Sequence, residues 1–78
     1  MNYKILIVDD EPANTRTLER MFKEHYDVLS AQSGAEALDL LNLHDVALII
    51  SDQRMPGMTG VEFLKRSAEV RPHCVRLI

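Results

Sequence analysis

Cysteine is nearly absent from the 78-residue sequence, which contains a single one, Cys74. A lone thiol has no partner within the chain, so an internal disulfide framework is excluded. Cys74 opens the apolar segment CVRLI, where we expect a small buried side chain rather than a reactive thiol. The length corresponds to one domain, residues 1–78, which must be held together by a hydrophobic core.

Clustered basic residues and long apolar runs are also missing. The net charge of -3, with Lys and Arg dispersed, argues against a nucleic-acid-binding surface. No apolar run approaches the roughly 20 residues that cross a bilayer, and the start MNYKILIV is too short for a secretion signal. We therefore expect no membrane association and a cytoplasmic location. The sequence also lacks the G-x-x-x-x-G-K-[ST] phosphate loop and the G-x-G-x-x-G dinucleotide fingerprint.

Short apolar segments alternate with amphipathic ones along the chain. Residues 4–8 (KILIV) and 46–50 (VALII) are continuous and rich in β-branched side chains, which is typical of strands buried on both faces of a parallel sheet. Residues 26–31 alternate imperfectly, which indicates a strand nearer an edge. Residues 74–78 are predicted to begin a fourth strand.

The segments between these strands predict three helices. The first starts at Pro12, a residue tolerated in a first helical turn. The second and third start at the capping boxes SGAE (33–36) and TGVE (59–62). The predicted buried stripes are Leu18, Met21, Phe22 and His25; Ala37, Leu38 and Leu41; and Val61, Leu64 and Ala68.

The resulting order, β-α-β-α-β-α-β, predicts an α/β fold with a parallel sheet covered by helices on both faces. Ligands of open α/β sheets bind outside the carboxyl ends of the strands. Asp9 and Asp10 follow the first strand and Asp52 follows the third. If these strands are neighbours, the three carboxylates converge in one crevice.

Three converging carboxylates repel one another, and either protonation or a hard cation relieves the repulsion. Mg²⁺ suits this set because it takes oxygen ligands and keeps several waters, leaving room for a phosphate oxygen. A free carboxylate beside a Mg²⁺-bound phosphoryl donor could form an acyl phosphate. The alternative is that each aspartate only caps a helix or shapes a turn. The joint placement at two strand ends favours the site.

The segment MPG after Asp52 is a turn signal, with Pro56 fixing φ and Gly57 accepting a positive φ. This turn either presents the carbonyl of Arg54 to the metal or simply reverses the chain, and both can hold. The three histidines share no metal-ligand spacing and are expected at the surface or at helix ends.

ILIVDDEP followed by LIISDQRMPGMTGVEFL resembles the receiver domain of two-component response regulators. The resemblance covers the whole chain and implies a flavodoxin-like fold. It further implies that Asp52 accepts a phosphoryl group from a histidine kinase or a small phosphodonor. Asp10 would bind Mg²⁺ directly, Asp9 through water, and Arg54 through its backbone carbonyl.

Measured against five-stranded receivers, the sequence is truncated within the fourth strand. The Ser/Thr after that strand and the Lys after the fifth, which contact the phosphoryl group in the family, have no counterpart. We expect the exposed fourth-strand edge to support homo-oligomers. One alternative is therefore a phosphorylation-incompetent interaction module. A weaker alternative is a Mg²⁺-dependent phosphohydrolase with an aspartate nucleophile, because such enzymes need a D-x-D pattern and here Gln53 and Arg54 follow Asp52. We expect no enzymatic activity beyond self-phosphorylation chemistry.

Overall fold

The computed structural model describes residues 3–77 and contains four strands and three helices in strict alternation. None of these helices is long and apolar enough to cross a membrane. In chain order the elements are β1 (Lys4–Val8), α1 (Pro12–Phe22), β2 (Asp27–Ala31), α2 (Gly34–Leu43), β3 (Leu48–Ser51), α3 (Gly60–Val70) and β4 (Val75–Leu77).

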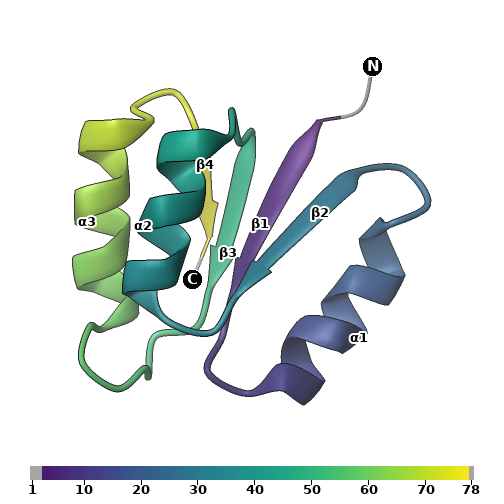
Figure 1. Ribbon diagram of the computed structural model, residues 1–78, viewed down its shortest axis with the longest axis horizontal. Helices are drawn as coiled ribbons and strands as arrows, with labels where there is room; N and C mark the ends of the chain where they lie inside the picture. Colours follow the sequence, from purple (N-terminus) through teal and green to yellow (C-terminus); the bar gives the residue numbers. More distant parts are fainter. Residues whose placement is uncertain (1–2, 78) are drawn as a thin grey trace.

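The four strands form one parallel sheet in the order β2-β1-β3-β4. The chain moves from β1 to β2 in one direction and then back across β1 to β3 and β4. Because parallel crossovers are right-handed, this reversal puts α1 on one face and α2 and α3 on the other. Figure 1 shows α2 and α3 side by side, away from α1. The predicted α/β fold with helices on both faces is confirmed.

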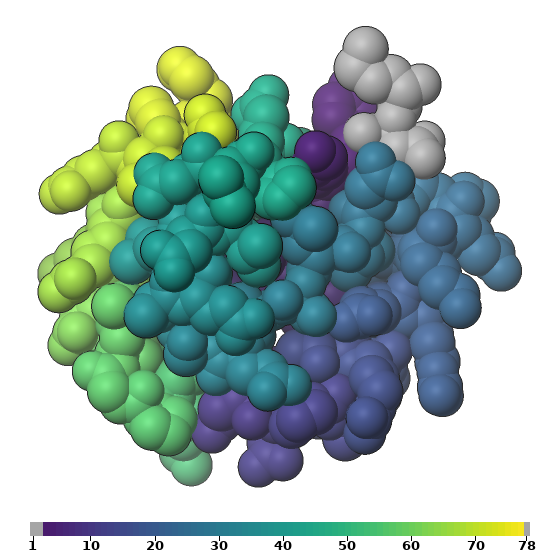
Figure 2. Space-filling view, in the orientation of Figure 1, coloured from purple at the N-terminus to yellow at the C-terminus, as the bar shows by residue number. Residues whose placement is uncertain are grey.

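The main core lies between the sheet and the pair α2 and α3. Leu6 and Val8 point to this side and meet Ala37, Leu41 and Phe63. Phe63 is fully buried, and burying a side chain of that size contributes about 1.5–3 kcal/mol. In the space-filling view, α2 and α3 cover the central strands on this face (Figure 2).

The opposite face of the sheet is covered unevenly. Ile7, Ile50 and Leu77 are partners in the strand register and so lie at the same height on β1, β3 and β4. Ile7 is buried, Ile50 is half-buried and Leu77 is 52% exposed. Coverage by α1 therefore fades from β1 towards the β4 edge.

Several predicted boundaries need correction. β1 matches its prediction, but β3 begins at Leu48, two residues later than expected, and extends to Ser51. β2 begins at Asp27, one residue later than expected, and lies at an edge as predicted. The fourth strand is seen as Val75–Leu77, and Ile78 lies outside the described residues.

The helix faces were predicted less well than the helices themselves. α1 ends at Phe22, so His25 lies beyond the helix, and Met21 is 64% exposed rather than packed. In α3 the buried side chains are Phe63 and Ser67, whereas Val61 points outward. Leu64 packs against the core as predicted, whereas Ala68 is exposed, so the packed face is rotated from the one that the apolar spacing indicated. The stripe predicted for α2 is confirmed, with Ala37 and Leu41 buried and Leu38 packed against the core.

Both capping boxes cap their helices through the N-cap hydroxyl, but within residues 3–77 neither glutamate carboxylate accepts from the N–H of its own N-cap residue. Ser33 Oγ accepts from the N–H of Glu36, and Thr59 Oγ1 accepts from that of Glu62. The carboxylate of Glu36, however, accepts from the N–H of Gln32 and not from that of Ser33. Each N-terminus is thus tied to the loop that leads into it.

Candidate metal and phosphoryl site

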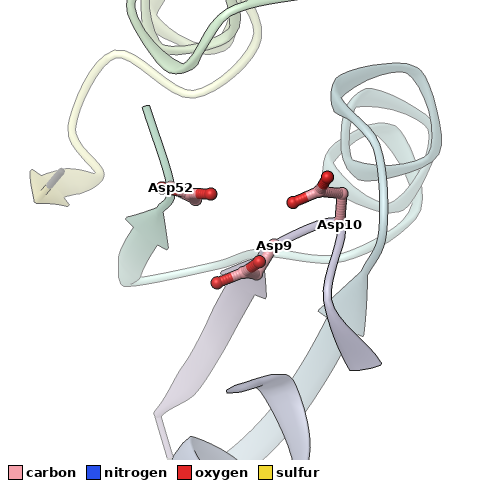
Figure 3. A group of neighbouring side chains, drawn as sticks. All are labelled: Asp9, Asp10 and Asp52. Carbon is pink, nitrogen blue, oxygen red and sulfur yellow. The ribbon is translucent and has the colours of Figure 1, made fainter. Parts of the chain in front are cut away.

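The strand register brings the three predicted aspartates together. Val8 of β1 pairs with Ser51 of β3, so the residues that follow, Asp9 and Asp52, leave the sheet side by side. One carboxylate oxygen from each of Asp9, Asp10 and Asp52 lies within 4.8 Å of the others, and all three residues are half-buried. In Figure 3, the carboxylates of Asp10 and Asp52 point towards each other, with Asp9 at the end of β1.

Asp9 differs from its two neighbours because donors within the chain hold both of its carboxylate oxygens. The backbone N–H of Glu11 donates to Oδ1 at 2.9 Å, and the side-chain amide of Asn14 donates to Oδ2 at 3.1 Å. Within residues 3–77, Asp9 is the member of the cluster whose carboxylate takes part in such hydrogen bonds. The turn-forming role considered for the acidic pair therefore does apply to Asp9.

The N-cap position of α1 belongs to Glu11, which makes no side-chain capping bond. Neither Asp9 nor Asp10 is thus the N-cap of this helix. Asp10 is left with its carboxylate free to face Asp52.

The loop after Asp52 contains the predicted turn. Gly57 has φ of 83°, in the left-handed region that glycine adopts without strain, and Pro56 precedes it. Asp10 and Arg54 line the same open groove of about 510 Å³, together with Gln53, Met55, Pro56 and Thr59. Arg54 therefore lies at the same groove as one member of the acidic cluster, Asp10.

This donor set fits a hard divalent cation. Carboxylate and carbonyl oxygens are the ligands that Mg²⁺ prefers, and an open groove leaves room for the waters that it keeps. Closely spaced carboxylates at one edge of the sheet also create a local negative potential, which a cation neutralises.

The remaining candidates take no part in the acidic cluster. His44 is the C-cap of α2, and His25 and His73 are exposed, as the lack of a shared ligand spacing predicted. Met55 is buried in the main core, and Met58 packs against it. Cys74 is buried as expected, and burial raises the pKa of its thiol, although Arg76 opposes the shift.

Two residues near the cluster had not been predicted. Asn14 holds the Asp9 carboxylate, and Gln53 bonds to the start of α3 through both its side chain and its main chain. Asn14 is five residues from its partner, on the first turn of a predicted helix, so the spacing offered a weak signal. The partner of Gln53 lies across a loop whose path the sequence does not show.

A doubly wound parallel sheet with an acidic cluster at the carboxyl ends of two adjacent strands defines the class of open α/β proteins whose ligands bind at this edge. Residues 5–78 match the family model of the response regulator receiver domain. The chain belongs to this family, whose members are signalling domains of two-component systems and receive input from histidine kinases or phosphodonors. The predicted resemblance is confirmed, and the phosphohydrolase alternative has no support from this assignment.

The curated relatives include whole regulators and single-domain proteins. The chain is 46% identical over 74 residues to the hydrogenase transcriptional regulatory protein HoxA of Cupriavidus necator, covering 95% of this chain and 15% of that protein. It is 43% identical over 67 residues to the sporulation initiation phosphotransferase F of Bacillus subtilis, covering 85% of this chain and 54% of that one. The chain thus spans between about a seventh and a half of these relatives.

Solved receiver structures share the fold. A CheY-like receiver domain protein from Methanospirillum hungatei superposes with a TM-score of 0.93 at 28% identity, covering 97% of this chain and 62% of that one. The receiver domain of the hybrid histidine kinase CckA gives a TM-score of 0.87 at 33% identity, covering 94% of this chain and 70% of that one.

Proposed function

We propose that this receiver domain binds Mg²⁺ at its acidic cluster and accepts a phosphoryl group on Asp52. The observation that carries the proposal is the approach of the three carboxylates to within 4.8 Å at the sheet edge where ligands of this fold bind. The family assignment of residues 5–78 supports the same reading. The domain would act in the cytoplasm as a phosphoacceptor and not as an enzyme with turnover.

Asp10, Asp52 and the backbone carbonyl of Arg54 would hold the cation directly, and Asp9 would contact it through water. The hydrogen bonds of Asp9 support this division, since a carboxylate that already accepts two N–H donors has fewer lone pairs left for a direct metal bond. When bound, Mg²⁺ supplies charge neutralisation for the carboxylates and for the oxygens of the phosphoryl group.

The chemical step assigned to this chain is nucleophilic. A carboxylate oxygen of Asp52 attacks the phosphorus of the donor and forms a P–O bond. The bond from phosphorus to the donor atom, an imidazole nitrogen in a phosphohistidine or an oxygen in an acyl phosphate, breaks, and the leaving group takes the electron pair. Asp52 is half-buried, and the groove lined by Asp10, Gln53 and Arg54 lies beside it in the sequence and at the same sheet edge, which supports access for such a donor.

The test is intact-mass measurement after incubation with acetyl phosphate and Mg²⁺, for wild type and Asp52→Asn. We expect one phosphoryl adduct in the wild type, no adduct in Asp52→Asn, and no adduct when EDTA removes the metal. A folded wild-type protein that binds Mg²⁺ without forming an adduct would overturn phosphoryl transfer. It would favour the alternative of a phosphorylation-incompetent interaction module.

The second part of the proposal concerns partners. Besides a histidine kinase or small phosphodonor, we propose that copies of the chain associate through the β4 edge. β4 is the outer strand of the described sheet, and Val75 and Leu77 are 59% and 52% exposed. An apolar edge with unpaired backbone groups is a template for pairing with a second chain.

A further inference from the structure

Gln53, the residue directly after Asp52, is tied to the start of α3 by two separate oxygens. Its side-chain Oε1 accepts from the backbone N–H of Val61 at 3.1 Å. Its backbone carbonyl accepts from the N–H of Gly60 at 3.0 Å. A helix begins with N–H groups that have no partner within the helix, and Gln53 satisfies two of them in α3 from across the loop.

These bonds close residues 53–60 into a ring that contains the turn. Directly before the ring in the chain, the N–H of Asp52 donates to the carbonyl oxygen of Val8, which continues the pairing of β3 with β1. Inside the ring, Met55 is 7% exposed and anchored in the main core. Arg54 lies between these fixed points, so its main chain is restrained on both sides.

The capping bonds of Gln53 are not replaced by another residue in the described chain. Thr59, the N-cap of α3, uses its Oγ1 for Glu62, and its backbone carbonyl accepts from Phe63. Removing the Gln53 acceptor would therefore leave the N–H of Val61 to water and loosen the loop at the residue next to Asp52.

We propose that Gln53 is a positioning residue for the cation and phosphoryl site, acting through Arg54 and Asp52. It holds the loop so that the Arg54 carbonyl and the Asp52 carboxylate face the same point as Asp10. The inference rests on the proposed function, because the atoms that Gln53 positions matter only if the cluster binds the cation.

The test compares Gln53→Met, which keeps the length of the side chain without a good acceptor, with Gln53→Glu, which keeps an acceptor for Val61. Gln53→Asn, one methylene shorter, is a milder loss of the same contact. Gln32→Met is the matched control, since Gln32 is also exposed and its side-chain amide takes no part in the hydrogen bonds of residues 3–77. Mg²⁺ affinity by calorimetry and hydrogen exchange at the Val61 amide are measured for each variant, and affinities are corrected for the folded fraction.

We expect Gln53→Met to bind Mg²⁺ roughly tenfold more weakly, the lower end of the effect of residues that orient metal ligands. Gln53→Asn should weaken binding less, and Gln32→Met should match the wild type. Gln53→Glu should keep both the protection of Val61 and tight binding; a residue needed only for bulk would instead tolerate Gln53→Met as well, because both variants keep the size of the side chain. If Gln53→Met binds Mg²⁺ within twofold of the wild-type affinity, the inference about Gln53 is overturned while the proposed function stands. A wild type that does not bind Mg²⁺ would overturn the proposed function and this inference with it.

Discussion

The backbone N–H of Asp52 donates a hydrogen bond to the carbonyl oxygen of Val8 at 2.8 Å. This bond continues the pairing of β3 with β1 one residue beyond the end of β3. On the other side of β1, the N–H of Asp9 donates to the carbonyl of Ala31. The residues that carry the cluster are therefore held by the sheet itself, and the adjustable parts are the side chains and loops around them.

Asn14 should control how well the cluster holds a cation. Asn14→Leu removes the donor to Oδ2 of Asp9, so the carboxylate loses one of its two fixed contacts. We expect Mg²⁺ affinity, measured by calorimetry, to fall by roughly tenfold, with little change in stability because Asn14 is exposed. Thr17→Leu is the control, because Thr17 is on the same helix but its hydroxyl donates to the carbonyl of Ala13 and not to the cluster. Equal affinities for the two variants would show that Asp9 needs no such support.

Phe63 should contribute most to stability among the side chains of α3. It is fully buried at the centre of the main core. Phe63→Ala should cost about 3–5 kcal/mol of the free energy of unfolding, a large share of what a small domain has. Phe63→Leu should cost about 1–2 kcal/mol and keep the chain folded. Urea titration followed by circular dichroism measures the free energy of unfolding of both variants, and Val61→Ala, at an exposed residue, is the control. A urea midpoint of Phe63→Ala equal to that of Val61→Ala would contradict the packing described.

Cys74 should make stability fall at alkaline pH. Burial raises the pKa of its thiol, Asp45 adds to the shift and Arg76 opposes it. Above the ordinary thiol pKa the unfolded chain loses this proton while the folded chain keeps it, so the free energy of unfolding decreases as pH rises through that window. Below that window the thiol is protonated in both the folded and the unfolded chain, so it adds no pH dependence to the free energy of unfolding.

The comparison of wild type with Cys74→Ala isolates this contribution from other groups that titrate at high pH. Urea titrations on both sides of the ordinary thiol pKa should show a steeper loss in the wild type. Iodoacetamide should also alkylate the folded protein far more slowly than the urea-unfolded one. Parallel pH profiles for the two proteins would mean that the thiol is accessible to water.

Leu77→Lys should reduce self-association. Leu77 lies on the edge strand and is exposed, and an edge lysine opposes strand pairing between chains. Light scattering over a concentration series should show a smaller average mass than for the wild type. Val61→Lys, a change at an exposed apolar residue of α3, is the control and should leave the mass unaltered. A wild type that stays monomeric throughout would remove the proposed β4 interface.

The sequence predicted the order of elements, the parallel sheet and the convergence of Asp9, Asp10 and Asp52, because each depends on short-range patterns and on general rules of chain crossover. It placed the start of β3 two residues too early, since an apolar run does not reveal where strand pairing begins. It included Leu64 correctly in the packed face of α3 but took Val61 in place of Phe63, because both are apolar and only packing against the core distinguishes them. The hydrogen bonds of Asn14 and Gln53 depend on loop paths that no local pattern specifies.

The register between β1 and β3 has a consequence for folding fidelity. Successive residues of a strand point to opposite faces, so a slip of one residue would turn Asp52 away from Asp9 and Asp10. If the cluster binds a cation, then only the correctly registered chain gains the stabilisation of RT ln(1 + [L]/Kd), where [L] is the free cation concentration. Mg²⁺ would in that case shift a mixed population towards the chains in which β1 and β3 are correctly paired. The stoichiometry of Mg²⁺ binding would then report the fraction of chains in that register.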